Sequence, residues 1–200
     1  MGRCEAGKEL DGINGMNEMN STPGLSLATL GGGCFWCTQA VFSALRGVAR
    51  VTCGYSGGTP VNPTYEQVCT GTTGHAEVVR VEFDPSVIPY DDLLQIFFQT
   101  HDPTTLNRQG HDIGTQYRSV VFFHNEQQQR TAHETIDALN KSGAFRAPIV
   151  THVEPAAAFY PAEDYHQNYF AAHPTQSYCA AVIRPKIDKF RTKFQDYLDL

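Results

Sequence analysis

Apolar and polar positions alternate along this chain in ways that predict short strands and amphipathic helices. A two-residue period over 48–55 and over 76–83 is typical of strands with one buried face. Short apolar runs over 25–30 and 117–124 predict two further strands, the second apolar on both faces and therefore central. Residues 90–98 follow the i, i+3, i+4, i+7, i+8 spacing of a helix that covers a core.

Three more helices are expected from spacing and end signals. Helical spacing predicts one over 38–46, while Asn125 and Gly143 are typical caps for a second that ends near Ser142. Pro185 opens a third, whose apolar stripe should dock onto the core. Strands separated by helices of this length predict a sheet with helices packed on it.

Two long stretches, 101–116 and 156–173, follow neither period. Ordered polar loops as long as the first are usually functional in compact domains. Its pairs His101-Asp102 and His111-Asp112 lack metal-ligand spacing, so we interpret them as solvated loop residues. We interpret the aromatic and charged cluster inside the second stretch as a loop packed on the surface.

Composition narrows the class of protein. Two hundred residues suffice for one domain with a substantial core, which we assign to 25–200. A net charge of −6 argues against nucleic acid and anionic membrane surfaces as partners, and no apolar run approaches the length of a transmembrane helix. Residues 1–24 resemble neither a signal nor a transit peptide, so we interpret them as a flexible tail. With six cysteines and no secretion signal, we expect a reducing compartment, the cytoplasm, and a monomer.

The most distinctive stretch is Gly31-Gly32-Gly33-Cys34-Phe35-Trp36-Cys37. Because it follows a predicted strand and precedes a predicted helix, Cys34 should lie at a helix N-terminus, where free N–H groups lower the pKa of a thiol. If the helix begins there, Cys37 lies one turn later on the same face. Zinc would need a second ligand pair at similar spacing, and none follows, so a thiol redox or nucleophilic site is favoured over a metal site.

Glu77 is the second chemical candidate. It shares its predicted strand face with Val79, Val81 and Phe83, so the two-residue period directs a carboxyl toward the core. Two interpretations stay open: the strand end frays and the carboxyl bends into water, or the carboxyl is partly buried. In the second case its pKa would be raised, and it could donate a proton near neutral pH.

Motifs spread over the chain resemble those of one family. They surround Cys34 and recur, in the family's order, at Gly54-Tyr55-Ser56-Gly57-Gly58, Asn62-Pro63-Thr64-Tyr65, Gly74-His75-Ala76-Glu77, His101-Asp102-Pro103, Gly114-Thr115-Gln116-Tyr117-Arg118-Ser119 and Ala162-Glu163-Asp164-Tyr165-His166-Gln167. This set resembles the peptide methionine sulfoxide reductase A (MsrA) family from about Leu27 to Phe194. The resemblance implies an α+β two-layer sandwich with a ferredoxin-like core and long coil segments.

The resemblance also implies an activity: reduction of the S epimer of methionine sulfoxide, free or in proteins. Carried over position by position, it makes Cys34 the nucleophile that attacks the sulfoxide sulfur, and Glu77 the acid that protonates the sulfoxide oxygen. The resemblance makes Tyr65 and Tyr117 hydrogen-bond donors to that oxygen, and Asp112 the residue that helps to organise them. It makes Phe35 and Trp36 an apolar wall for the substrate methyl group. Donors placed where negative charge develops are what such a reaction needs.

A second thiol must then regenerate the nucleophile. The resemblance implies a sulfenic acid at Cys34 that condenses to a disulfide, which thioredoxin reduces, with no metal or organic cofactor. The family commonly places the resolving thiol in a C-terminal Tyr-Cys segment, which Tyr178-Cys179 resembles, but this chain also has Cys37 where many members have Gly. We favour Cys179, because its polar, mobile stretch could swing in, while a helical i, i+3 pair need not meet disulfide geometry. Cys37 and a relay through both stay open.

Two other classes of protein compete with this interpretation. A thioredoxin-like thiol–disulfide oxidoreductase would use Cys34 and Cys37 without needing Glu77, Tyr65 or Tyr117, and would reduce insulin but not methionine sulfoxide. A non-catalytic binder of oxidised methionine, or a zinc protein, would show no turnover, and the zinc protein would carry stoichiometric metal.

Overall fold

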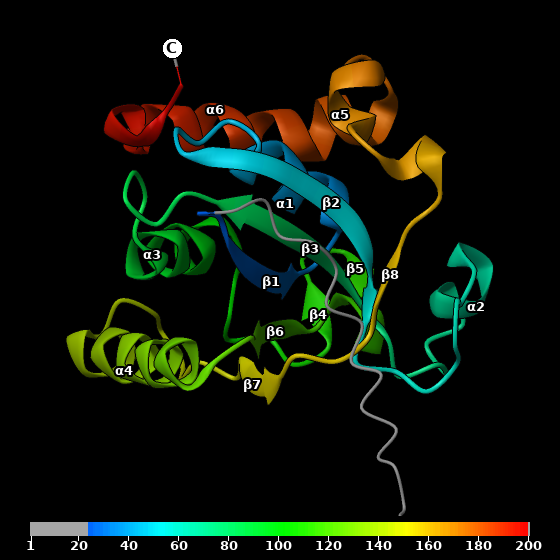
Figure 1. The fold of residues 1–200 in the computed structure, drawn as a ribbon. Helices are drawn as coiled ribbons and strands as arrows, with labels where there is room; N and C mark the ends of the chain where they lie inside the picture. The colour runs from blue at the N-terminus through cyan, green and yellow to red at the C-terminus, as the bar shows by residue number, and fades with distance from the viewer. Residues whose placement is uncertain (1–23, 200) are drawn as a thin grey trace, which may run out of the picture.

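A computed structural model describes residues 24–199 of the chain. Its main element is a six-stranded sheet in the order β7-β6-β1-β3-β2-β8, in which neighbours are antiparallel except for the parallel pair β6 and β7. The strands span Ser26–Gly32 (β1), Val48–Ser56 (β2), Ala76–Phe83 (β3), Ser119–Phe123 (β6), His152–Pro155 (β7) and Phe159–Pro161 (β8). The sheet is strongly curled, and β2 and β3 bend across the middle of the molecule (Figure 1).

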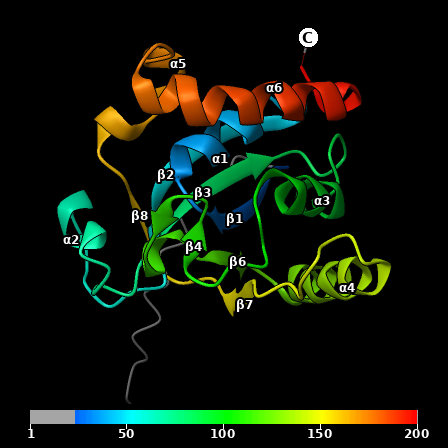
Figure 2. The ribbon, with the colours of Figure 1, turned by 180° about the vertical axis from the view of Figure 1, so that it is seen from behind.

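The helices gather in two groups. In both ribbon views α1, α5 and α6 lie along one side of the sheet and α3 and α4 lie next to each other, whereas α2 stands apart at the far end (Figures 1 and 2). Their bounds are Phe35–Phe42 (α1), Tyr65–Cys69 (α2), Tyr90–Thr100 (α3), Glu126–Ser142 (α4), Tyr169–Ala172 (α5) and Arg184–Lys193 (α6). A π-helical turn, Cys179–Ile183, leads directly into α6.

Burial follows the two faces of β3. Glu77, Val79, Val81 and Phe83 face the main core, which α1, α3 and α6 cover. The opposite face carries a small second cluster made of Ala76, Val78, Val120 and Phe122, against which Phe159 packs. The sheet therefore buries Glu77 among apolar side chains, which decides between the two interpretations of this residue: it is 2 % exposed.

Most of the predicted elements are confirmed. The strands 48–55 and 76–83 and the helices at 90 and 126 are present, with Asn125 accepting a hydrogen bond from the Gln128 N–H and Gly143 in the left-handed conformation. The predicted helix 38–46 begins earlier, at Phe35, and ends at Phe42. The stretches that followed neither period hold short elements fixed by distant partners, namely β8 and a hairpin of β4 (Arg108–Gln109) and β5 (Asp112–Ile113).

The architecture is mixed α/β, a curled sheet covered by helices. The four middle strands run in the order β6-β1-β3-β2, and β7 and β8 extend the sheet at its two edges. The finer description as a ferredoxin-like sandwich stays a prediction, as does the assignment of 25–200 to one domain. The flexible tail predicted for 1–24 lies outside the described residues except for Gly24.

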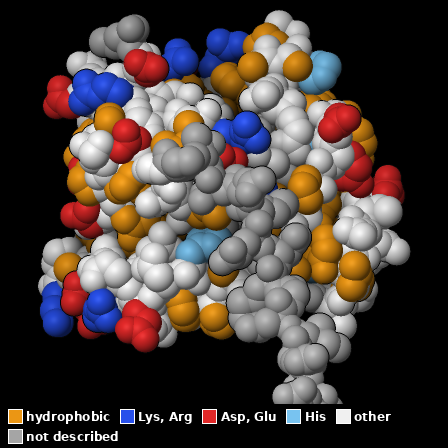
Figure 3. Space-filling view, viewed as in Figure 1, with side chains coloured by type: hydrophobic (Ala, Val, Ile, Leu, Met, Phe, Trp, Pro, Cys, Tyr) orange, Lys and Arg blue, Asp and Glu red, His pale blue; other side chains and the backbone are white. Residues whose placement is uncertain are grey.

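Two surface properties bear on function. On the face seen in Figure 3, acidic and basic side chains of the described residues lie interspersed. Within residues 24–199, no helix combines the length and the apolar run that crossing a membrane requires.

Candidate active site

Cys34 lies at the junction that the glycines predicted. It is the N-cap residue of α1, and its carbonyl accepts the Cys37 N–H at 3.1 Å. Gly33 turns the chain with φ +93°, and a Cβ there would lie 2.7 Å from the Gln109 Cβ, so the turn and the close approach both require glycine. The side chain of Cys34 is half-buried, so a substrate can reach it.

Glu77 is held against the same helix. Its Oε2 accepts the N–H of Phe35, the residue after Cys34, at 3.1 Å, which joins the core face of β3 to the first turn of α1. Burial raises the pKa of Glu77 well above its usual value, and the nearby Cys34 and Asp112 add to the rise, while the Phe35 N–H opposes it. The carboxyl is thus favoured in its neutral, proton-donating form.

The thiols do not behave as a lone cysteine at a helix N-terminus would. A hydrogen bond with Cys37, followed by burial, raises the pKa of Cys34, so the lowered pKa expected from the sequence is wrong for the substrate-free protein. The same hydrogen bond, with help from the Lys186 charge, lowers the pKa of Cys37 against the effect of burial. The two thiols therefore titrate together, and Cys37 is the more acidic of the pair.

Phenols surround this carboxyl–thiol pair. Tyr65 and Tyr117 both have a raised pKa, chiefly because of burial and also because of Glu77, so both stay neutral donors within the field of that carboxyl. The pKa of Tyr178 is raised by burial and then by Cys34, and its hydroxyl donates to Asp112 Oδ2 at 2.8 Å. The contact that the structure gives Asp112 is therefore with Tyr178, whereas its influence on Tyr117 acts through space.

Trp36 forms an aromatic wall with residues from the C-terminal third of the chain. Its ring stacks on Tyr169 at 3.8 Å between centroids with 7° between planes, and Tyr178 meets it edge-on at 6.1 Å. The Trp36 Nε1–H donates to His166 Nδ1 at 3.1 Å, so the neutral imidazole carries its proton on Nε2. Phe35 is 1 % exposed and supports this wall from within the core.

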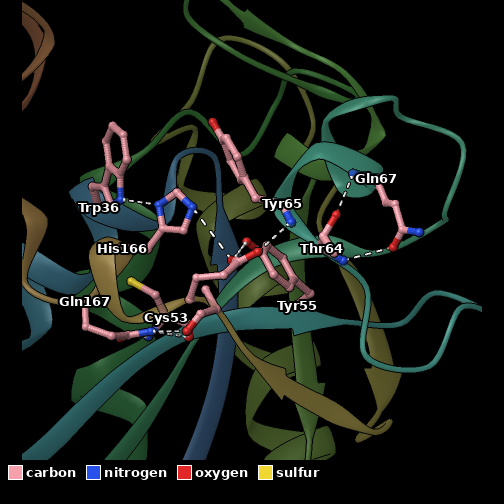
Figure 4. A network of polar contacts seen from close by, with 10 residues as sticks. Trp36, Cys53, Tyr55, Thr64, Tyr65, Gln67, His166 and Gln167 are labelled. Carbon is pink, nitrogen blue, oxygen red and sulfur yellow. Dashed lines mark hydrogen bonds and ion pairs between the residues drawn. The ribbon is translucent and has the colours of Figure 1, made fainter.

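Glu163 ties the wall to the sheet, and its contacts can be followed in Figure 4. Its carboxylate accepts the Tyr55 hydroxyl and the Tyr65 N–H, each at 2.9 Å, and lies 3.9 Å from His166 Nε2. Hydrogen bonds from the Tyr65 and Glu163 N–H groups and from the Tyr55 hydroxyl outweigh partial burial and lower the pKa of Glu163, which therefore stays ionised. Nearby, Gln167 bonds both the N–H and the carbonyl of Cys53, at 2.9 and 3.0 Å.

This network was missed from the sequence. The segment around Glu163 and His166 was interpreted as a surface loop, yet His166 is 1 % exposed. The missed residues with a place at the site are His166, Glu163, Tyr169 and Tyr178. The one signal in the sequence was that this short irregular stretch concentrates aromatic and ionisable residues. No spacing rule, however, pairs such a stretch with a helix far away in the chain.

The two candidate resolving thiols differ in their setting. Cys37 is buried on α1 and hydrogen-bonds with Cys34. Cys179 is fully buried at the start of the π-helical turn, directly after the polar stretch 174–178, and the movement expected of that stretch stays a prediction. Residues 24–199 contain no group of His, Cys, Asp and Glu side chains that could hold a metal ion, and all five cysteines in that range are unpaired.

Fold and site together define a class, that of mixed α/β proteins with a thiol at a helix N-terminus beside a buried carboxyl. The family model described as peptide methionine sulfoxide reductase matches residues 26–198. The chain is 55 % identical over 185 residues to "Peptide methionine sulfoxide reductase MsrA" of Polynucleobacter asymbioticus, covering 92 % of this chain and 97 % of that protein. The chain therefore belongs to the MsrA family of methionine sulfoxide reductases, which are oxidoreductases.

Solved structures agree with this membership. Reduced Mxr1 from Saccharomyces cerevisiae is 34 % identical with a TM-score of 0.73, covering 82 % of this chain and 94 % of that one. Mxr1 in complex with Trx2 is similar in fold, at 24 % identity and a TM-score of 0.52, over 76 % of this chain and 91 % of that one.

Proposed function

We propose that this chain reduces the S epimer of methionine sulfoxide, free or in proteins, with Cys34 as the nucleophile and Glu77 as the acid. The observation that carries the proposal is the buried Glu77 carboxyl bonded to the N–H of the residue after Cys34. A sulfoxide oxygen becomes basic as its sulfur is attacked, and a buried neutral carboxyl beside Cys34 is placed to protonate it.

The first half-reaction follows from the site. The Cys34 sulfur attacks the sulfoxide sulfur, and its proton passes to the hydrogen-bonded Cys37. Glu77 protonates the oxygen, whose negative charge Tyr65 and Tyr117 stabilise as neutral donors. The oxygen then forms a bond to the Cys34 sulfur while its bond to the methionine sulfur and the new sulfur–sulfur bond both break, so that Cys34 becomes a sulfenic acid and methionine leaves reduced by two electrons. Trp36 and Tyr169 provide the apolar surface for the substrate methyl group.

The second half-reaction closes a disulfide. Cys37 attacks the Cys34 sulfur and its proton passes to the sulfenic oxygen, so the sulfur–oxygen bond breaks and the oxygen leaves as water. Cys179, the thiol favoured from the sequence, is buried in a helical turn, and the structure gives it no hydrogen bond to Cys34. We therefore assign the first disulfide to Cys34 and Cys37, with Cys179 left as a second thiol in a relay.

Thioredoxin is the proposed reductant of that disulfide in a reducing compartment, the cytoplasm. The solved complex of Mxr1 with Trx2 supports this part of the proposal. No metal or organic cofactor has a role in these steps.

Separate single-turnover reactions with the S and R epimers, without reductant, test the proposal. We expect about one methionine per enzyme from the S epimer, none from the R epimer, and none from either with Cys34→Ser. Mass spectrometry of the spent enzyme should find Cys34 linked to Cys37. Cys53→Ser is the matched control, because Cys53 is buried and donates only to the Phe35 carbonyl. Methionine formation by Cys34→Ser would contradict the assignment of the nucleophile.

A further inference from the structure

A cavity lies on the side of Cys37 away from the sulfoxide-binding side of Cys34. It has a volume of about 330 Å³ and lies between α1, α3 and α6. Among the residues that line it are Cys37, His101, Asp102, Lys186, Lys189 and Lys193. Cys34, Glu77 and Tyr65 are not among them, so the cavity is separate from the side on which the sulfoxide would bind. Cys37 is the connection, because it lines this cavity and also hydrogen-bonds with Cys34.

The cavity is positively charged. Its three lysines sit at i, i+3 and i+7 of α6 and therefore share one face. None of them forms an ion pair within residues 24–199. The Lys186 charge helps to lower the pKa of Cys37, in the first turn of α1, and of His101, at the C-terminal end of α3.

The other ionisable groups at the cavity do not cancel this charge. Burial lowers the pKa of His101 to about 4, so its ring is neutral at pH 7. Its two nitrogens are taken by the Phe97 carbonyl at 2.7 Å and by the Ser119 hydroxyl at 2.7 Å. Asp102 is the one carboxylate among the described lining residues, and its Oδ1 accepts the N–H and hydroxyl of Thr104 at 2.9 and 2.6 Å.

We propose that this cavity binds a small thiol that carries carboxylates, of the size of a tripeptide, and delivers it to Cys37. The proposal rests on the proposed function, because it assumes the Cys34–Cys37 disulfide. A cavity of this volume is at the lower end of those that hold small organic ligands. Three unpaired ammonium groups suit carboxylates, and a ligand anchored by them presents its sulfur to the only thiol that lines the cavity.

The exchange balances in two steps. The ligand thiolate attacks the Cys37 sulfur, the Cys34–Cys37 bond breaks, and Cys34 leaves as a thiolate that takes a proton. A second thiolate then attacks the ligand's sulfur in the mixed disulfide, which releases Cys37 and the oxidised ligand. Two thiols give up two electrons, and the enzyme's disulfide gains them.

Binding is tested without turnover. S-Methylglutathione carries the carboxylates of glutathione but has no free thiol, so calorimetric titration with it measures the cavity alone. We expect the double variant Lys189→Gln/Lys193→Gln to weaken binding by about tenfold or more. Arg184→Gln/Arg191→Gln is the matched control, because it removes the same two charges from α6 at residues that line a different hollow. No binding by the wild-type chain, or equal binding by both variants, would overturn the proposal.

Reductant kinetics test the delivery step. With glutathione as reductant, the double variant should turn over methionine sulfoxide about tenfold more slowly than wild type, whereas dithiothreitol and the cationic thiol cysteamine should support equal rates in both. If thioredoxin rates fell while glutathione rates and S-methylglutathione binding did not, the lysines would serve a protein surface and the proposal would be wrong. Failure of the proposed function is distinguishable, since it would abolish turnover with every reductant while leaving S-methylglutathione binding intact.

Discussion

The two sides of Cys34 are built in different ways. On the acid side, Glu77 lies on β3, a strand paired with β1 and β2 on its two edges, and its face is set by the strand period. On the thiol side, Cys37 comes from the short α1 and Cys179 from a π-helical turn before α6. The hydrogen-bond ladder of the sheet fixes the Glu77 carboxyl in place, whereas both thiols lie on short helical segments that pack against the sheet without belonging to its ladder.

The largest expected effect on the rate comes from a substitution on the acid side. Glu77→Gln keeps an N–H donor but cannot transfer a proton readily, so methionine formation in a single turnover should fall by about 10²–10⁴-fold with substrate binding mostly retained. Glu82→Gln is the matched control, because it lies on the opposite face of the same strand and pairs with Arg50. A wild-type rate for Glu77→Gln, measured by rapid quench, would make Glu77 purely structural.

The same variant has a signature in stability. Because the pKa of Glu77 is raised in the folded state, its stabilising contribution is complete below the usual carboxyl pKa and is lost as pH rises through the folded value. Wild type should therefore lose more free energy of unfolding than Glu77→Gln between pH 5 and 9, as measured by urea denaturation. The rate of the chemical step should also fall as pH rises from 5 to 9, and only in wild type, since the protonated carboxyl is the donor.

The acid side was also the more predictable from the sequence. A two-residue period is a local property, so β3 and the face of Glu77 could be predicted from eight consecutive residues, and the glycines before Cys34 marked its turn. What spacing left open was burial, because it depends on the helices that cover the strand. The sheet resolves this by placing Glu77 2 % exposed beneath α1.

The thiol side and the aromatic wall could not be derived from local pattern. Trp36 meets His166 and Tyr169 across 130 residues or more, and β8 exists only because Phe159–Pro161 pairs with β2. The pKa of Cys34 was wrongly predicted for the same reason. A helix N-terminus is a local signal, whereas the hydrogen bond with Cys37 and the burial that outweigh it are properties of the packed site.

The second expected effect separates the two thiols. With thioredoxin as reductant, Cys37→Ser should release about one methionine per enzyme and then stall, because the condensing thiol is lost. Cys179→Ser should continue to cycle, since Cys179 is not the partner that hydrogen-bonds with Cys34. Dithiothreitol should rescue Cys37→Ser, as a small thiol can reduce the sulfenic acid directly. A stalled Cys179→Ser beside a cycling Cys37→Ser would restore the ranking drawn from the sequence.

The smallest expected effect concerns the two phenols on the acid side, Tyr65 and Tyr117, and tests whether both donate to one sulfoxide oxygen. Tyr65 and Tyr117 are both neutral donors within the field of Glu77, and the charge of Tyr117 adds to the rise in the pKa of Tyr65. Either alone can stabilise part of the developing charge, so Tyr65→Phe and Tyr117→Phe should each slow the chemical step by about tenfold. Because each partly covers for the other, the double variant should lose more than the product of the single losses.

Tyr55→Phe is the control that separates catalysis from support. Its hydroxyl is also buried and bonded, but to Glu163 Oε2 at 2.9 Å, on the structural side of the network. Removing it leaves a half-buried carboxylate short of one donor, so the free energy of unfolding should fall by about 0.5–1.5 kcal/mol while the single-turnover rate changes little. If Tyr55→Phe slowed chemistry as much as Tyr65→Phe does, the phenols would act by holding the Glu163 network rather than by donating to the sulfoxide oxygen. Strict additivity of Tyr65→Phe and Tyr117→Phe would show that the two hydroxyls serve separate purposes.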